Sequence, residues 1–226
     1  MQSNKIKLIF YSGGQTDKNR LVHQALSDLV PQKKSKSMTY IPFCKDGANP
    51  YFYRLKRRYT RYGFNRFLQV PVDEDFSERD FTHALQSDVI YLAGGNTYYF
   101  LHHLMKKKLL ARLKKYAMEG GVLAGLSAGG LIMTPHIELA GYPDFCSDDN
   151  EVGLKRFKGL GLVRFEFFPH FSQSKRFRNA LLRYSKHSKF PVCALKDGSG
   201  LVVSSGNIKC LGSGFWFEKG KMARLK

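Results

Sequence analysis

The feature that most constrains the fold is the stretch 122–133, in which an apolar run leads directly into a glycine-rich turn and then into helix-compatible residues. The turn reads Gly125-Leu126-Ser127-Ala128-Gly129, which is a G-x-S-x-G motif. A serine on a tight strand-to-helix turn has its hydroxyl pushed into a cleft, and small neighbours let the turn close. The sequence therefore predicts a strand, a sharp turn and a helix, with Ser127 as a candidate nucleophile.

Strand-like and helix-like segments alternate over the first three quarters of the chain. The strand-like runs are residues 7–11, 38–43, 66–70, 88–93, 122–126 and 162–168. The helix-like runs are residues 19–29, 51–62, 77–85, 96–118 and 174–184. From residue 192 onward, short strands are separated by glycine turns, which is typical of antiparallel pairing. The pattern predicts an α/β fold with a mainly parallel sheet, helices on both faces and a short antiparallel C-terminal extension.

Length and composition favour one domain over residues 1–226. The chain has 226 residues, of which 43% are hydrophobic, enough for one well-buried core. No run approaches the roughly 20 apolar residues of a membrane span, and the N-terminus lacks the apolar core of a signal peptide. We therefore expect a cytoplasmic protein with no membrane partner. The four scattered cysteines show no metal-ligand spacing and are expected to be reduced, mostly buried thiols.

The chain is strongly basic, with a net charge of +19. Residues 51–67 carry six Lys and Arg and no acid, and tyrosines are interleaved with them. Such a surface attracts polyanions. No helix-turn-helix, RNP-type or zinc-finger signature accompanies it, so we interpret these residues as a solvated helix face and do not expect nucleic-acid binding.

An active serine needs amide donors for the oxyanion that forms when it attacks a carbonyl. The backbone N–H of Ala128 follows the serine at a helix N-terminus, where negative charge is favoured. A second strand-to-helix turn, Ala93-Gly94-Gly95-Asn96-Thr97, offers another amide and contains glycines that allow close approach. It could instead cradle a phosphate, although neither nucleotide-binding glycine pattern is present.

The serine also needs a base, normally a histidine held by a carboxylate. His136 would lie about 13 Å along a continued helix, at roughly 1.5 Å per residue, which is too far. His102 and His103 fall on a helix, where a surface role is the simpler interpretation. His170 ends a strand-like run, and the ends of parallel strands are where open α/β sheets present catalytic groups. His170 is the candidate base.

Four short segments of the chain, taken together and in this order, form a specific sequence pattern. They are Gly94-Gly95-Asn96-Thr97, Gly125-Leu126-Ser127-Ala128-Gly129, Pro169-His170-Phe171 and Ala194-Leu195-Lys196-Asp197-Gly198-Ser199. This order resembles the dipeptidase E family of serine peptidases, which includes aspartyl dipeptidase and is related to cyanophycinase. The resemblance covers most of the chain. It implies a flavodoxin-like α/β fold similar to that of class I glutamine amidotransferases, with serine in place of their cysteine.

Carried over residue by residue, the resemblance makes Ser127 the nucleophile and His170 the general base. It also implies that Gly95 and Ala128 supply the oxyanion-hole amides. Class I amidotransferases have a glutamate two residues after their histidine, whereas Ser172 stands there in this chain. The family pattern places an acid at the position of Asp197, in a turn after the penultimate sheet segment.

A second acid downstream of the nucleophile maps loosely to Asp144, which stays an alternative. The aspartyl dipeptidases of the family use an arginine after the histidine strand to bind the acidic N-terminal residue of the substrate. The segment 172–178 is shorter here and has no arginine at the matching position, so an Asp-X preference is not assumed. Arg176, or Lys175, is the candidate replacement, and Asn96 is the other candidate substrate-binding residue.

These observations predict a serine-type peptidase that hydrolyses short peptides without a metal or an organic cofactor. The alternative is a catalytically weak or inactive binding protein on the same scaffold, with the basic surface facing an anionic partner. An esterase with Ser127, Asp144 and His170 in the chain order of α/β-hydrolases is a further alternative. A homodimer is compatible with the sequence.

Overall fold

A large sheet dominates the computed structural model, which describes residues 5–13 and 16–225. Within these residues the sheet has seven strands in the order β3-β2-β4-β5-β1-β8-β9. The strands are β1 (Lys7–Tyr11), β2 (Lys36–Ile41), β3 (Phe64–Gln69), β4 (Val89–Leu92), β5 (Val122–Leu126), β8 (Gly200–Ser204) and β9 (Asn207–Leu211). The first five pair in parallel, and β8 and β9 are antiparallel. The predicted α/β fold with a mainly parallel sheet is confirmed.

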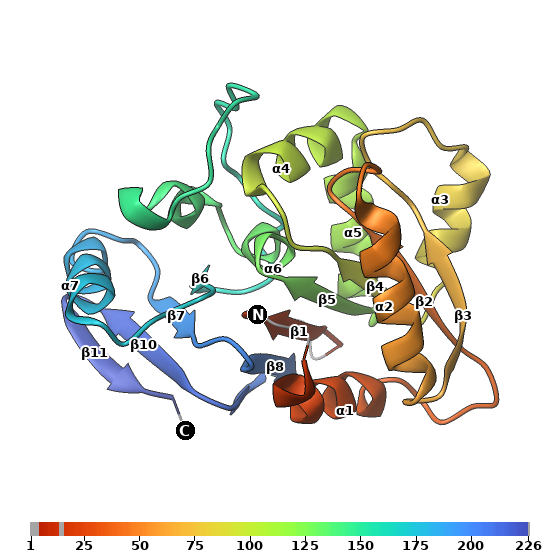
Figure 1. Cartoon of the computed structure of the whole chain (residues 1–226), viewed down its shortest axis with the longest axis horizontal. Coiled ribbons are helices and arrows are strands. Elements are labelled where there is room, and N and C mark those ends of the chain that lie inside the picture. The colour runs from red at the N-terminus through yellow and green to blue at the C-terminus, as the bar shows by residue number, and fades with distance from the viewer. Residues whose placement is uncertain (1–4, 14–15, 226) are drawn as a thin grey trace.

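Helices cover both faces of this sheet (Figure 1). The helices are α1 (Arg20–Asp28), α2 (Ala48–Thr60), α3 (Glu78–Leu85), α4 (Thr97–Lys106), α5 (Leu109–Met118) and α6 (Ala128–Met133). Because side chains alternate along a strand, Ile9 of β1 packs in one core with α1 and α2. Phe10 packs in the opposite core with α3, α4, α5 and α6. Two apolar layers therefore hold the sheet between helices.

The segment 96–118 is not the single long helix that its leucine stripe suggests. α4 ends at Lys106 and α5 begins at Leu109, because Lys108 adopts a left-handed conformation with φ 55°. The break lies in the polar run 106–108, and the leucines on either side, Leu104 and Leu113, still enter the same core. A leucine pattern alone does not distinguish one helix from two that pack on the same face.

A second, smaller sheet carries the C-terminal part of the chain. Its strands are β6 (Glu166–Phe168), β7 (Val192–Leu195), β10 (Gly214–Glu218) and β11 (Lys221–Arg224), and α7 (Lys175–Tyr184) follows β6. Their order is β11-β10-β7-β6, and β6 and β7 are parallel. The expected strand at 162–168 is therefore shorter and belongs to this sheet. The C-terminal strands, which were predicted to form one antiparallel extension, are divided between the two sheets. β8 and β9 belong to the large sheet, and β7, β10 and β11 belong to the small one.

The two sheets share one apolar core. The ring of Phe10 in β1 lies 5.4 Å from that of Phe165 and 5.2 Å from that of Phe167, which precedes the candidate base. In Figure 1 the small sheet, in blue, lies beside the large one. The packing of Phe10 against Phe165 and Phe167 fixes how the small sheet approaches the turn that carries Ser127.

The short 3₁₀ turns are η1 (Asp17–Asn19), η2 (Glu138–Gly141) and η3 (Asp144–Cys146).

Two further sequence expectations concern membranes and thiols. Across the described parts of the chain, no helix combines the length and apolar character that crossing a membrane requires. The four cysteines are free, as expected, but only Cys193 is buried, and Cys146 is exposed.

A buried histidine lies between the large sheet and α2. The side chain of His23 is 2% exposed, and its Nδ1 lies 3.2 Å from the Tyr11 hydroxyl and 3.1 Å from the Tyr59 hydroxyl. Burial, and next the positive charge of Arg58, lower the pKa of His23 to about 3, although the backbone of Thr16 acts in the opposite direction. His23 is therefore neutral in the folded protein at neutral pH.

This neutral histidine predicts a pH dependence of stability. Its pKa is lower in the folded than in the unfolded chain, so the unfolded chain binds the proton first as the pH falls below about 6. The free energy of unfolding should then decrease with falling pH, by at most about 1.4 kcal/mol per pH unit from this group. Urea unfolding of wild type and His23→Gln at pH values from about 7 to about 4 measures it. The variant should show the smaller slope, and parallel curves would contradict the assignment.

Candidate functional site

Ser127 lies on the turn between β5 and α6 with φ 48° and ψ −108°, a conformation that a non-glycine residue rarely adopts. Two motif glycines let the turn close. A Cβ atom on Gly125 would press on the backbone of Gly129, and one on Gly129 would overlap the Leu92 carbonyl. The Ser127 N–H donates to the Tyr11 carbonyl at 2.9 Å. The predicted strand-turn-helix elbow is therefore present and is tied to β1.

His170 faces the serine from the second sheet. Its Nε2 lies 2.9 Å from Ser127 Oγ. The residue follows β6 and has φ 56°, and its own N–H donates to Ser12 Oγ at 2.8 Å. Ser12 Oγ in turn donates to the Leu195 carbonyl at 2.7 Å. One buried hydroxyl at the end of β1 thus connects the backbone of His170 to the end of β7.

Asp197 lies behind the histidine. Its Oδ1 is 2.7 Å from His170 Nδ1, and it follows β7 in the chain. With Asp197 ionised, we assign the ring proton to Nδ1, which leaves the Nε2 lone pair to accept from the serine hydroxyl. Asp144 is exposed in η3 and makes no hydrogen bond or ion pair with His170 in the described structure. Of the two acids proposed from the sequence, the fold brings Asp197 to the histidine, and not Asp144.

Gly13 lies directly against this pair, and the sequence did not single it out as part of the site. A Cβ atom at this position would overlap both Asp197 Oδ1 and the His170 ring. Only glycine leaves room there for the acid and the base to meet. One sequence signal could have identified Ser12 and Gly13. They directly follow β1, which pairs in parallel with β5, and the carboxyl ends of parallel strands lie at the same edge of a sheet.

The two proposed oxyanion donors lie on neighbouring turns, because β4 and β5 pair in parallel. Gly95 has φ 141°, and a Cβ atom there would overlap the Phe43 ring, so the position requires glycine. Ala128 begins α6. Within the described loops and turns, neither amide N–H donates to a backbone acceptor. Gly95 lines the cleft beside Ser127, whereas Ala128 is 1% exposed and is not among the lining residues.

The two proposed substrate-binding side chains lie elsewhere. Asn96 caps α4, with its Oδ1 accepting from the Tyr99 N–H at 2.9 Å, and its Nδ2 donates to the Asp149 carbonyl at 2.8 Å. The Arg176 guanidinium lies 3.6 Å from the centroid of the Phe145 ring. Neither residue lines the cleft that contains Ser127. Asn96 instead lines an adjoining pocket that shares Phe43, Cys44 and Asp46 with this cleft.

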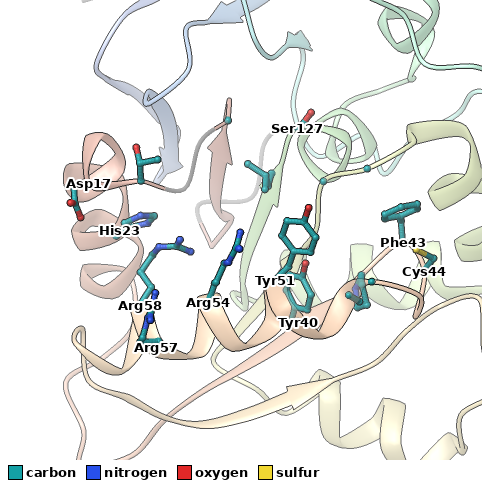
Figure 2. A pocket seen from close by; sticks show the side chains of 18 of the residues that line it. Asp17, His23, Tyr40, Phe43, Cys44, Tyr51, Arg54, Arg57, Arg58 and Ser127 are labelled. Carbon is teal, nitrogen blue, oxygen red and sulfur yellow. The ribbon is translucent and has the colours of Figure 1, made fainter.

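A cleft of about 950 Å³ opens at this site. Gly13, Gly95, Ser127 and His170 contribute to its lining, and α1 and α2 form much of the rest (Figure 2). Arginines of the basic segment 51–67 belong to this lining. Arg54, Arg57 and Arg61 are exposed, as expected for a solvated helix face, and this exposed side of α2 also forms one wall of the cleft.

Comparisons with known proteins identify the relatives of this chain. The family model described as peptidase family S51 matches residues 8–211. An uncharacterized peptidase of Pasteurella multocida is 31% identical over 152 residues, covering 64% of this chain and 70% of that protein. A probable alpha-aspartyl dipeptidase of Drosophila melanogaster is 24% identical over 198 residues, covering 83% of this chain and 77% of that protein.

Two solved structures are similar in fold. A putative peptidase E from Listeria monocytogenes superposes with a TM-score of 0.72 at 18% identity, covering 92% of this chain and 98% of that one. A peptidase from an acI-B1 actinobacterium gives a TM-score of 0.75 at 18% identity, covering 100% and 96%. The family match spans the elbow, the histidine and the acid behind it, and the chain therefore belongs to peptidase family S51.

Proposed function

We propose that this peptidase is a serine hydrolase of short peptides that uses Ser127, His170 and Asp197. The observation that carries the proposal is the continuous contact from Ser127 Oγ to His170 Nε2 at 2.9 Å and from His170 Nδ1 to Asp197 Oδ1 at 2.7 Å. A serine hydroxyl is a weak nucleophile at neutral pH unless a base accepts its proton. This arrangement supplies the base and holds it in the required tautomer.

In the first step, Ser127 Oγ attacks the scissile carbonyl carbon while its proton passes to His170 Nε2. The carbonyl oxygen becomes an oxyanion that the Gly95 and Ala128 amides stabilise. His170 then gives the proton to the leaving nitrogen, the C–N bond breaks, and an acyl-serine ester remains. Water attacks this ester with His170 again as base, which releases the acid and restores Ser127. Asp197 stabilises the imidazolium in both halves.

Peptides are the proposed substrates because the family is a peptidase family and two of its relatives are named as dipeptidase or peptidase E. A preference for an N-terminal aspartate is not part of the proposal. The arginine nearest to the expected position, Arg176, stacks on Phe145 and does not line the cleft.

A fluorophosphonate probe tests the nucleophile directly, since it reacts with serines that are activated by a base. We expect one probe per chain, located on Ser127 by peptide mass spectrometry, and no labelling of Ser127→Ala. A folded wild-type protein that stays unlabelled would favour the alternative of an inactive binding protein.

A further inference from the structure

One face of α2 carries four arginines that line the cleft. Arg54, Arg57, Arg58 and Arg61 stand at positions i, i+3, i+4 and i+7, which lie on one side of a helix. The other side carries the buried Leu55 and Tyr59. Figure 2 shows the side chains of Arg54 and Arg58 rising from α2, with Arg58 beneath His23 of α1, in the same view as Ser127. We call these four residues the arginine stripe.

Arginines outnumber acids in the lining of this cleft, by five to two. Arg20 of α1 joins the arginine stripe in the cleft, and Asp17 and Asp46 are the acids of the same lining. Among the described residues, no carboxylate forms an ion pair with Arg20, Arg54, Arg57 or Arg61. Like charges gathered in a concave surface focus a positive potential, which concentrates anions there.

Arg54 is partly positioned by its neighbour. Its guanidinium lies 5.8 Å from the centroid of the Tyr51 ring, one turn earlier on the same face. This distance is within the range of about 6 Å over which an aromatic ring attracts a guanidinium. The guanidinium group itself can bind a carboxylate through two parallel hydrogen bonds, so the arginine stripe offers suitable donors as well as charge.

The length of the stripe indicates the size of its ligand. Arg61, the C-cap of α2, lies seven positions after Arg54, which corresponds to about 10 Å along the axis. An extended peptide advances roughly 3.3–3.6 Å per residue, so about three residues span the stripe. A ligand that occupies the stripe and also reaches Ser127 must therefore be longer than a dipeptide.

We propose that the arginine stripe is a subsite for the acidic side chains of an oligopeptide substrate, with several Asp or Glu residues outside the scissile bond. This proposal rests on the proposed function, because it takes Ser127 as the point of cleavage. A peptide is favoured over a nucleic acid because the stripe shares one cleft with Ser127. The volume of that cleft is typical of a small-ligand pocket, whereas nucleic-acid interfaces extend over a much larger surface.

The test measures binding separately from catalysis. Fluorescein-labelled hexa-aspartate is titrated into the Ser127→Ala protein, which cannot consume it, and fluorescence anisotropy gives the dissociation constant. We expect binding that weakens as salt rises, and weaker or no binding of hexa-serine. Adding Arg54→Gln and Arg57→Gln should weaken hexa-aspartate binding by about tenfold or more, since each charged hydrogen bond contributes on that order.

The matched control removes the same amount of charge from residues outside the cleft. Lys56→Gln with Arg66→Gln removes two positive charges from α2 and β3, and neither residue lines the cleft. Its effect on binding should stay below about threefold, as expected for exposed charges acting through a screened field. Equal losses in the two double variants would show a general charge effect and overturn the subsite.

Two other results would also overturn it. They are no binding of hexa-aspartate, and tighter binding of a thymidine hexanucleotide with the same dependence on Arg54 and Arg57. Fluorophosphonate labelling of the wild type distinguishes failure of the acidic subsite from failure of the proposed serine hydrolase. If Ser127 is labelled but hexa-aspartate does not bind, the subsite fails and the hydrolase stands. If hexa-aspartate binds as expected but Ser127 is not labelled, the hydrolase fails and the cleft is an anion-binding site without catalysis.

Discussion

Replacing Ser127 with alanine is expected to reduce kcat/KM for peptide hydrolysis by about 10⁵-fold or more, because the variant has no atom that can form the acyl ester. The Gly95 and Ala128 amides and the cleft remain, so the residual rate should exceed that in water. The fold should persist, since the Ser127 hydroxyl makes its hydrogen bond to His170 and not to the core. Release of free amine from a set of di- to hexapeptides measures the rate.

Ser204→Ala is the matched control for this variant. Ser204 is half-buried, as Ser127 is, but it lies on β8 away from the cleft lining. Its kcat/KM should stay within about twofold of the wild type, as is usual for a change that touches no special feature. Turnover that survives in Ser127→Ala at the level of this control would mean that another group performs the chemistry.

The second large effect is expected for Asp197→Asn. An asparagine offers an N–H as well as a carbonyl to His170 Nδ1, which permits the tautomer whose Nε2 carries the proton and cannot accept one from serine. The comparable substitution in other serine enzymes costs about 10⁴ in kcat, and we expect a loss of about 10³- to 10⁴-fold. Because the carboxylate side chain is 60% exposed, the variant should fold normally.

Asp144→Asn gives the comparison that decides between the two acids. It removes the same charge from an exposed turn in which the side chain makes no contact with His170. Its kcat should change by less than about twofold. The opposite ranking, with Asp144→Asn the slower enzyme, would show that the acid acts from a conformation other than this one.

The sequence was sufficient for the elbow and the base, because both depend on local pattern. Glycines at 125 and 129 around Ser127 predict a closed turn, and a histidine at a strand end predicts an accessible ring. The choice between Asp197 and Asp144 depended on which loop reaches His170, and that follows from the pairing of β6 with β7. Pairing between strands so distant in sequence leaves no local signature.

The division of the C-terminal strands was hidden for the same reason. Short alternating runs such as 200–204 and 214–218 have the same pattern whether they extend one sheet or form another. In the structure β8 pairs with β1 of the large sheet, whereas β10 pairs with β7 of the small one. The role of residues 51–67 was also undetermined, because charge and helical spacing identify a polar face but not whether a neighbouring helix turns it into a cleft wall.

The hydroxyl of Ser12 has a consequence for how this enzyme would lose activity. Ser127 follows a strand of the large sheet, His170 follows a strand of the small one, and Asp197 lies in the connection between them, from β7 to β8. The Ser12 hydroxyl hydrogen-bonds to the backbone at both His170 and Leu195. The proposed catalytic residues are therefore in contact only while the two sheets remain packed together at this edge. If the two sheets separated slightly at this edge, catalytic activity would be lost while the strands of each sheet stayed hydrogen-bonded. Loss of activity would therefore report the separation of the sheets before any measurement of secondary structure did.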